Sequence, residues 1–250
     1  MPIKKMIAGL MLSVLAPVAS ASTVSVINAH HDITEHRSGG LIERGYTTNL
    51  FKHQPRGWDA AIAAGDTIVV EQRGVDGSNT ADVQDFLTAG GRIILLGDDS
   101  DITVDFYNDI FGTSISFNAP IDPTTWSQTD AVLGTAFEDD AETLRFADSV
   151  YATTDALAEG SSIYYEGETG AQVFSSIFGA GELFYIGWDY CCGATPDVYD
   201  DYYDVLESAI GGRATVAPVP LPASLPLMVL GLGGFGLVAR RKRQIGQAKR

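Results

Sequence analysis

The amino-acid sequence predicts a three-layer α/β domain, with a mostly parallel central sheet and a partly antiparallel edge. Apolar runs rich in β-branched residues alternate with amphipathic segments, as in chains built from βαβ units. The predicted strand Arg92–Leu96 (RIILL) has four consecutive apolar residues after its arginine, which is typical of a strand buried on both faces. Residues 22–212 are numerous enough to form one domain with a substantial core.

The first half of this domain contains one well-marked βαβ unit. Its helix is predicted over Thr80–Ala89, where Val83, Phe86 and Leu87 share one face and Gly90-Gly91 ends the helix. A second helix is expected to end before Gly112. The strands and helices predicted in this half are Thr23–Ala29, Thr67–Glu71, Thr80–Ala89, Arg92–Leu96 and Thr103–Phe111, followed by an extended segment over Thr113–Phe117.

The second half is richer in predicted strands. Gly179-Ala180-Gly181 separates two of them and indicates a hairpin turn. A last helix is predicted over Asp197–Ile210, ending at Gly211-Gly212. The three strands predicted before that helix are Ser161–Tyr165, Gln172–Phe178 and Glu182–Trp188.

Both ends of the chain carry targeting features. Lys4 and Lys5, the apolar run Met6–Val18 and the triplet Ala19-Ser20-Ala21 form a secretory signal peptide over residues 1–21, which the Sec machinery reads. Near the other end, residues 221–239 hold no charged side chain and are just long enough for a transmembrane helix. The basic cluster at 240–243 (RRKR) is then expected on the cytoplasmic side, followed by a cytoplasmic tail over 244–250.

The motif before the apolar segment resembles a known sorting signal. Val219, Pro220, Leu221, Pro222 and Ala223 follow a linker at 213–220 and, with the apolar segment and RRKR, resemble the VPLPA variant of the PEP-CTERM domains. The resemblance implies an exosortase, a membrane protease or transpeptidase, as a partner. It also implies a Gram-negative cell surface or extracellular matrix as the destination. The plain alternative is a tail anchor without processing.

Charge excludes one class of partner. Eight of the 16 Lys and Arg residues lie in the targeting segments, which hold none of the 32 acidic residues, so the domain between them has a net charge of −24. Such a domain repels nucleic acid, and no nucleic-acid partner is expected. A solvated acidic surface and weak binding of divalent cations in a secreted matrix both remain open.

The domain also resembles the class I glutamine amidotransferase-like superfamily of flavodoxin-like folds. The resemblance lies in Thr67–Val70, Leu87–Gly97 and Gly181–Trp188. Catalytic members carry a nucleophilic Cys after the strand that matches Arg92–Leu96, where this chain has Gly97-Asp98-Asp99-Ser100-Asp101. Because acyl transfer of this kind needs the thiolate, the sequence predicts no catalytic residue for it.

Two loops could hold a metal ion. The first follows the strand Thr23–Ala29 and the second follows Arg92–Leu96; imidazole and carboxylate ligands suit zinc or a similar divalent ion. If the two strands are neighbours, their loops meet at the carboxyl edge of the sheet. The alternative is that these residues only cap the strand end and the next helix, with no cofactor. The candidate ligands are His30, His31, Asp32, Glu35, His36, Asp98 and Asp99.

Two further groups complete the candidate residues. Tyrosines and aspartates alternate near the last helix, an arrangement that suits either sugar stacking or a buried aromatic face beside an acidic wet face. Cys191 and Cys192 are adjacent, so in an oxidising compartment they could form a strained disulfide with each other or pair with another chain. The tyrosine and aspartate group comprises Asp189, Tyr190, Asp197, Tyr199, Asp200, Asp201, Tyr202, Tyr203 and Asp204.

The function that these features favour is that of an exported surface or matrix protein with a non-catalytic domain. The first alternative is a divalent-metal hydrolase that uses the His30–His36 and Asp98–Asp101 loops. The second is a carbohydrate-binding module of an exopolysaccharide matrix, with the tyrosine and aspartate group as its binding surface.

Overall fold

The structure is a computed structural model, and the part of the chain that it describes belongs to one unit within residues 21–214. The described residues are 23–27, 33, 40–51, 55–65, 67–71, 74–75, 77–97, 102–118, 124–146, 151–152, 156–168, 170–188, 190 and 196–211. The predicted signal peptide, the linker and the sorting motif lie outside them.

Parallel strands form one half of the sheet, in the order β2-β1-β3-β4-β11. The predicted strand Arg92–Leu96 is confirmed as β4, and its last four side chains are fully buried because both faces of the sheet are covered. The bounds are β1 Thr23–Ile27, β2 Thr47–Phe51, β3 Thr67–Val70, β4 Arg92–Leu96 and β11 Gly181–Ile186.

The other half is antiparallel and larger than the edge that the sequence predicts. From β11 the sheet continues through β10, β9, β6 and β7, and the short strands β5 and β8 pair beside β10. Four of these strands, β5 to β8, carry few consecutive apolar residues, which is why the sequence pattern does not reveal them. The bounds are β5 Phe117–Asn118, β6 Thr124–Gln128, β7 Thr143–Phe146, β8 Tyr151–Ala152, β9 Ser162–Gly167 and β10 Gly170–Phe178.

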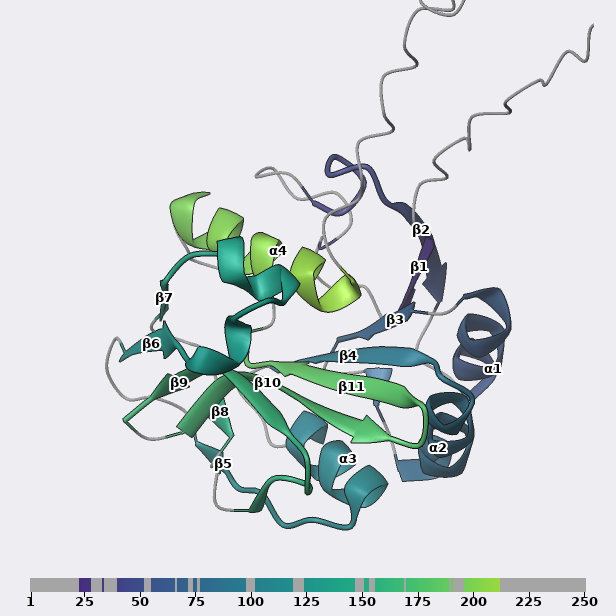
Figure 1. Ribbon diagram of the computed structural model, residues 1–250. Helices are drawn as coiled ribbons and strands as arrows, with labels where there is room; N and C mark the ends of the chain where they lie inside the picture. The colour runs from purple at the N-terminus through teal and green to yellow at the C-terminus, as the bar shows by residue number, and fades with distance from the viewer. Residues whose placement is uncertain are drawn as a thin grey trace, which may run out of the picture. The chain divides into compact units, whose positions relative to one another are not determined.

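The predicted hairpin between β10 and β11 is confirmed. Phe178 pairs with Gly181, and Gly179 has a φ of 62°, a backbone conformation that glycine adopts without strain. A Cβ atom on Gly179 would lie 2.7 Å from the Cα atom of Thr88, so the turn packs directly against the end of helix α2 (Thr80–Thr88). Figure 1 shows this turn beside α2.

Helices cover both faces of the sheet, which confirms the three layers. Helix α4 lies over one face and α3 over the other (Figure 1), and α1 and α2 contribute to the same core as α3. Three short 3₁₀ helices complete the described elements. The bounds are α1 Pro55–Ala64, α2 Thr80–Thr88, α3 Ile102–Phe111, α4 Pro196–Ile210, η2 Gly77–Asn79, η3 Asp130–Val132 and η4 Ala136–Asp139.

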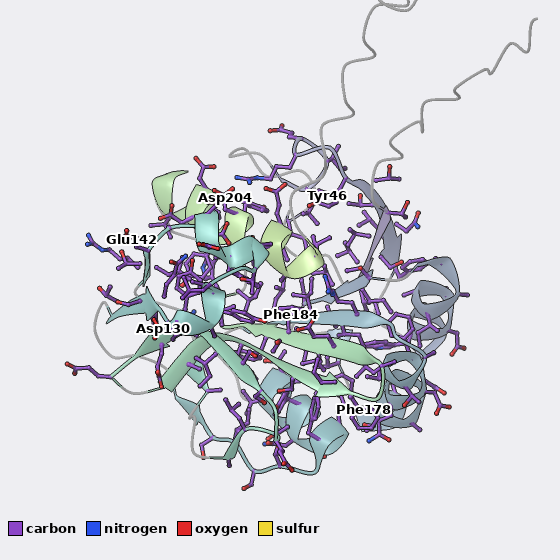
Figure 2. All side chains as sticks on the ribbon, viewed as in Figure 1. Tyr46, Asp130, Glu142, Phe178, Phe184 and Asp204 are labelled. Atoms are coloured by element: carbon purple, nitrogen blue, oxygen red, sulfur yellow. The ribbon has the colours of Figure 1, made fainter. Side chains whose placement is uncertain are left out.

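Alternate residues of each central strand point to opposite faces and build two cores. In β4, Ile94 and Leu96 belong to the core under α4, whereas Ile93 and Leu95 belong to the core under α1, α2 and α3. Figure 2 shows Asp204 on the α4 side of the sheet and Phe178 on the other side. The two-residue period of a strand therefore fixes which helix each apolar side chain supports.

Two elements of the parallel half, β2 and α1, are not predicted from the sequence. The strand Thr47–Phe51 (TTNLF) has only two apolar residues, because it lies at the edge of the sheet and is partly exposed. Helix α1 (PRGWDAAIAA) is rich in alanine, which favours a helix but gives only a weak apolar stripe.

No helix among the described residues is long and apolar enough to span a bilayer. The predicted transmembrane segment at 221–239 lies outside those residues.

Candidate functional site

The strand order contains a switch point between β1 and β3. From β1 the chain moves outward to β2, and it then returns to the other side of β1 to form β3 and β4. In open α/β sheets, ligands bind beyond the carboxyl ends of the strands at such a switch. The ends of β1 at Ile27 and β3 at Val70 therefore mark the candidate site.

A buried carboxylate lies at this switch point. Glu71 follows the last residue of β3, and only 5% of its surface is exposed. Its backbone N–H donates to the carbonyl oxygen of Ile27 at 3.2 Å, which fixes it beside the end of β1. Burial of a carboxylate is costly unless the group is paired, so an acid at this position indicates a specific structural or functional role.

The turn after Glu71 is tightly held. Gly74 donates its N–H to the carbonyl oxygen of Glu71 at 2.7 Å, and the indole nitrogen of Trp58 donates to the carbonyl oxygen of Gly74 at 2.9 Å. A Cβ atom on Gly74 would lie 2.9 Å from Val70 and 3.0 Å from Ile27. Helix α1 thus supports the turn through Trp58, and only glycine fits over the strand ends.

Glu71 stands at the end of a predicted strand but is not among the candidates that the sequence suggests. The available signal is a carboxylate directly after a buried apolar strand, with glycine three residues later. The predicted metal ligands His30, His31, Asp32, Glu35, His36, Asp98 and Asp99 all lie outside the described residues. No group of three or more His, Cys, Asp or Glu within the described part of the chain is arranged to hold a metal ion.

The strand order nevertheless corrects one premise of the predicted metal site. Strands β1 and β4, from which the two candidate loops leave, are not neighbours, because β3 lies between them. Two strand spacings separate their ends by roughly 10 Å. A site shared by the two loops would therefore have to include the end of β3, where Glu71 lies.

The tyrosines near α4 do not form a sugar-binding surface. Tyr199 is 6% exposed and Tyr202 and Tyr203 are fully buried, so their rings are not available to stack on a polysaccharide. Trp188 packs against Tyr202 with ring centroids 4.4 Å apart. The alternative interpretation, a buried aromatic face on a helix whose other face carries exposed Asp200, is confirmed.

Tyr190 has an unusual backbone in this aromatic cluster. Its φ is 59°, in the left-handed region that a bulky residue rarely adopts, and its side chain is 1% exposed. Its hydroxyl donates to the carbonyl oxygen of Tyr202 at 2.7 Å. Burial raises the pKa of Tyr190 well above its usual range, so the phenol remains neutral and keeps its role as donor.

Arg44 ties the segment before β2 to α4. Its guanidinium contacts Asp204 at 2.7 Å and Glu207 at 2.8 Å, and it lies 5.2 Å from the centroid of the Tyr203 ring. Burial lowers the pKa of Arg44, but the hydrogen bonds to the two carboxylates outweigh burial and leave the pKa raised. These ion pairs join the segment before β2 to α4.

The remaining candidates from the sequence fall outside the described part of the chain. These are Cys191, Cys192 and Asp189, together with the motif at 219–223. The described residues therefore contain two notable polar features, a buried carboxylate at the switch point and a structural ion-pair cluster under α4.

Residues 218–243 match the family described as the PEP-CTERM protein-sorting motif. The match includes the predicted motif Val219–Ala223 and the basic cluster, and it confirms a sorting signal of this kind. The signal supports export, processing by an exosortase and a cell-surface or extracellular location. No curated protein matches the chain.

Solved structures share the α/β fold at low sequence identity. A cytoplasmic protein from Salmonella typhimurium LT2 is 12% identical, with a TM-score of 0.55, over 75% of this chain and 97% of the other. A candidate GMP synthase component from Thermoplasma acidophilum is 12% identical, with a TM-score of 0.52, over 76% and 94%. A candidate ThuA-like protein from Parabacteroides merdae ATCC 43184 is 10% identical, with a TM-score of 0.51, over 81% and 95%.

Proposed function

We propose that the chain delivers a non-catalytic α/β domain to the outside of a Gram-negative cell, where the domain acts in adhesion or in the matrix. The sorting motif at 218–243 is the observation that carries the proposal. In this scheme the signal peptide is removed after Ala21, and residues 221–239 hold the chain in the membrane until the exosortase acts near Val219–Ala223.

The proposed fold within the α/β class is flavodoxin-like, related to the class I glutamine amidotransferase-like superfamily. The order of the parallel strands, β2-β1-β3-β4-β11, supports this assignment because flavodoxin-like sheets have the order 2-1-3-4-5. The chain has no Cys at the position after β4 that the nucleophile of that superfamily takes. Its amidotransferase chemistry is therefore not part of the proposal.

Processing of the tail is the direct test. In a host that contains an exosortase, the full chain is expected to appear outside the cell with a lower mass than the chain that has lost only its signal peptide. A variant in which Pro220 and Pro222 are both replaced by Ala is expected to stay intact in the membrane fraction. Replacing Pro55 by Ala, outside the motif, is the matched control and should leave processing unchanged. Intact chain in the cytosol would contradict the proposal.

A divalent-metal site is the second candidate function, and the buried Glu71 favours it. Glu71 follows β3, the strand that lies between β1 and β4, from which the two candidate loops leave. There it could bind the same metal ion as residues of both loops, such as His31 and Asp98. In that case the metal would act as a Lewis acid or would lower the pKa of a bound water.

Metal content of the purified domain, residues 22–212, tests this second function. Stoichiometric zinc or manganese that is lost both in Glu71→Gln and in a His31→Ala, Asp98→Ala double variant would establish the site. Asp139→Asn changes an exposed acid in η4 and serves as the control. Absence of bound metal from the wild-type domain after equilibration with either ion would reject the metal function and leave the sorting proposal intact.

A further inference from the structure

Strand β2 is one of the two ends of the sheet. Figure 1 shows it at the end away from β7. Within the described part of the chain it pairs only with β1, in parallel. Its outer backbone N–H and C=O groups can therefore pair with an added strand.

The strand carries none of the features that usually protect an edge. Thr47–Phe51 contains no charged residue and no proline, and its five residues pair with β1 in one register without a bulge. The opposite edge strand, β7, has four residues, and both Arg145 within it and Glu142 just before it are exposed. An added strand is therefore expected at β2 rather than at β7.

Exposed apolar side chains lie on β2 and just before it. Leu50 is 58% exposed and points to the same face as Val26, its partner in β1, whose side chain belongs to the core under α4. Ile42, in the turn that leads into β2, is 44% exposed. A partner that covers these side chains removes apolar surface from water, in addition to pairing the backbone groups.

Charge is distributed unevenly between this end of the domain and the rest. Residues 22–75, which include β2, hold five Lys or Arg and six Asp or Glu residues, a net charge of −1. Residues 76–213 hold three and 26, a net charge of −23. Two copies that meet at β2 bring their near-neutral segments together, so they repel one another less than they would through the acidic remainder.

The end at which β2 begins is nevertheless acidic. Glu43, in the turn before the strand, is exposed. Arg44 in the same turn contacts Asp200, Asp204 and Glu207 of α4 at 3.5, 2.7 and 2.8 Å. Three carboxylates share one guanidinium, so this group has a net negative charge even before Glu43 is added.

The other end of β2 is followed by cations. Lys52 is the next residue after the strand in the sequence, and Arg56 is the second residue of α1. They outnumber the exposed acid of that helix, Asp59. Because antiparallel strands run in opposite directions, such a pair of β2 strands brings the acidic beginning of each strand beside the basic end of the other. A second copy of this chain thus has the charge pattern that the edge requires.

We propose that two copies of this chain join through β2 as a symmetric dimer, in which the two strands pair antiparallel about a two-fold axis at Asn49. This register pairs all five residues of both strands, with Asn49 opposite its own copy and Leu50 opposite Thr48. The two Leu50 side chains then lie diagonally across the pair, on the α4 face, within reach of one another. The dimer depends neither on the sorting of the chain nor on a metal.

Disulfide trapping of the full chain tests the register. The chain is exported to the oxidising periplasm of a Gram-negative host, in a background with Cys191→Ser and Cys192→Ser, and is analysed by non-reducing electrophoresis. Asn49→Cys is expected to give a disulfide-linked dimer, because directly opposite residues of antiparallel strands have Cα atoms about 4.5–5.5 Å apart. Thr47→Cys is the matched control on the same strand. It lies opposite Phe51, about 14 Å from its own copy, and is expected to stay monomeric.

A charge on the strand tests the interface itself. Leu50→Lys, added to Asn49→Cys, should lower the trapped fraction about tenfold, because lysine discourages the pairing of an edge strand and the two lysines repel one another. Ile177→Lys changes a comparably exposed apolar residue on β10, at 54%, and should leave the fraction unchanged. Thr48→Lys, on the same face of β2, replaces Leu50→Lys if the latter is not exported at the wild-type level.

Three results would overturn the dimer. The first is that Asn49→Cys stays monomeric, in which case the edge serves a different partner, such as an extended peptide. The second is equal trapping through Asn49→Cys and Thr47→Cys, which would indicate random collision of chains. The third is an equal loss of dimer in the β2 lysine variant and in Ile177→Lys.

Discussion

The two faces of the sheet are stabilised in different ways. Under α1, α2 and α3 the core is largely apolar and aromatic, with residues such as Val83, Leu87 and Phe174 packed against the strands. Under α4 the core also contains buried polar groups, including the Tyr190 hydroxyl and the ion pairs of Arg44. Both faces contain buried hydrogen bonds, such as the one between the hydroxyls of Tyr107 and Ser176 under α3, but the second face also requires that the charges of Arg44, Asp204 and Glu207 be satisfied.

The largest effect is expected on the apolar face, from Phe174→Ala. Phe174 is fully buried between Tyr185 and Tyr107, with ring centroids 5.1 and 5.4 Å away. Its truncation leaves a cavity and should lower the free energy of unfolding by about 3–5 kcal/mol. Urea denaturation of residues 22–212 measures this loss. Phe174→Leu keeps most of the volume and should recover much of the stability; a loss as large as that of Phe174→Ala would show that ring contacts dominate over volume.

The next effect is expected on the α4 face, from Arg44→Met. This change leaves Asp204 and the 95%-buried Glu207 close together without their shared cation. Loss of one partner of a fully buried pair costs about 3–5 kcal/mol, and the partial exposure of Asp204 should reduce the cost to about 2–3 kcal/mol. Arg145→Met, at an exposed position on β7, is the control in the same urea experiment. Equal stability of the two variants would contradict the difference between the faces.

A smaller effect is expected from Tyr190→Phe, which removes the donor to the Tyr202 carbonyl oxygen. The buried hydrogen bond should contribute about 1–2 kcal/mol. Burial raises the pKa of Tyr190 in the folded state, so its stabilising effect is present below the ordinary tyrosine pKa of about 10 and is lost as pH rises above it. The free energy of unfolding of the wild-type domain should therefore fall as pH rises above about 10. In Tyr190→Phe the slope of this fall should be smaller by about 1.4 kcal/mol per pH unit. Parallel pH profiles for the two proteins would show that Tyr190 does not hold its proton.

The smallest effect is expected from Glu182→Gln, because the Arg92–Glu182 pair is partly exposed. Its loss should cost less than about 1 kcal/mol and should shrink further at high salt. The contrast with Arg44→Met sharpens the comparison, since burial is what separates the two ion pairs. A salt-independent loss of several kcal/mol would indicate that Glu182 supports the end of α4 through Arg92 rather than through a surface ion pair.

The elements that the sequence reveals are those with strong local signals. Strand β4 has an unbroken apolar run over residues 93–96, α2 has one apolar face before a pair of glycines, and the β10–β11 turn has two flanking glycines. By contrast, β2 and β6 are partly polar, and only their place in the sheet makes them strands. The extent of the antiparallel half follows from long-range pairing that no local pattern encodes.

The candidate site shows the same limit. A cluster of histidines stands out in a sequence, whereas Glu71 has only a weak sequence signal, and its burial beside the end of β1 follows from the placement of β3 between β1 and β4. Likewise, the tyrosines of α4 suit either sugar stacking or a core, and the packing of Trp188 against Tyr202 decides for the core. Residue type suggests the chemistry that is available, but strand order and burial determine which groups meet.

The sheet is completed by a segment that the ribosome makes late. Strand β4 pairs with β11, which ends at Ile186, and the core on one face is complete only when α4, which ends at Ile210, has joined it. A nascent chain that lacks these residues has an open strand edge and an uncovered apolar face. The complete sheet and both cores therefore form only after residue 210 has been synthesised.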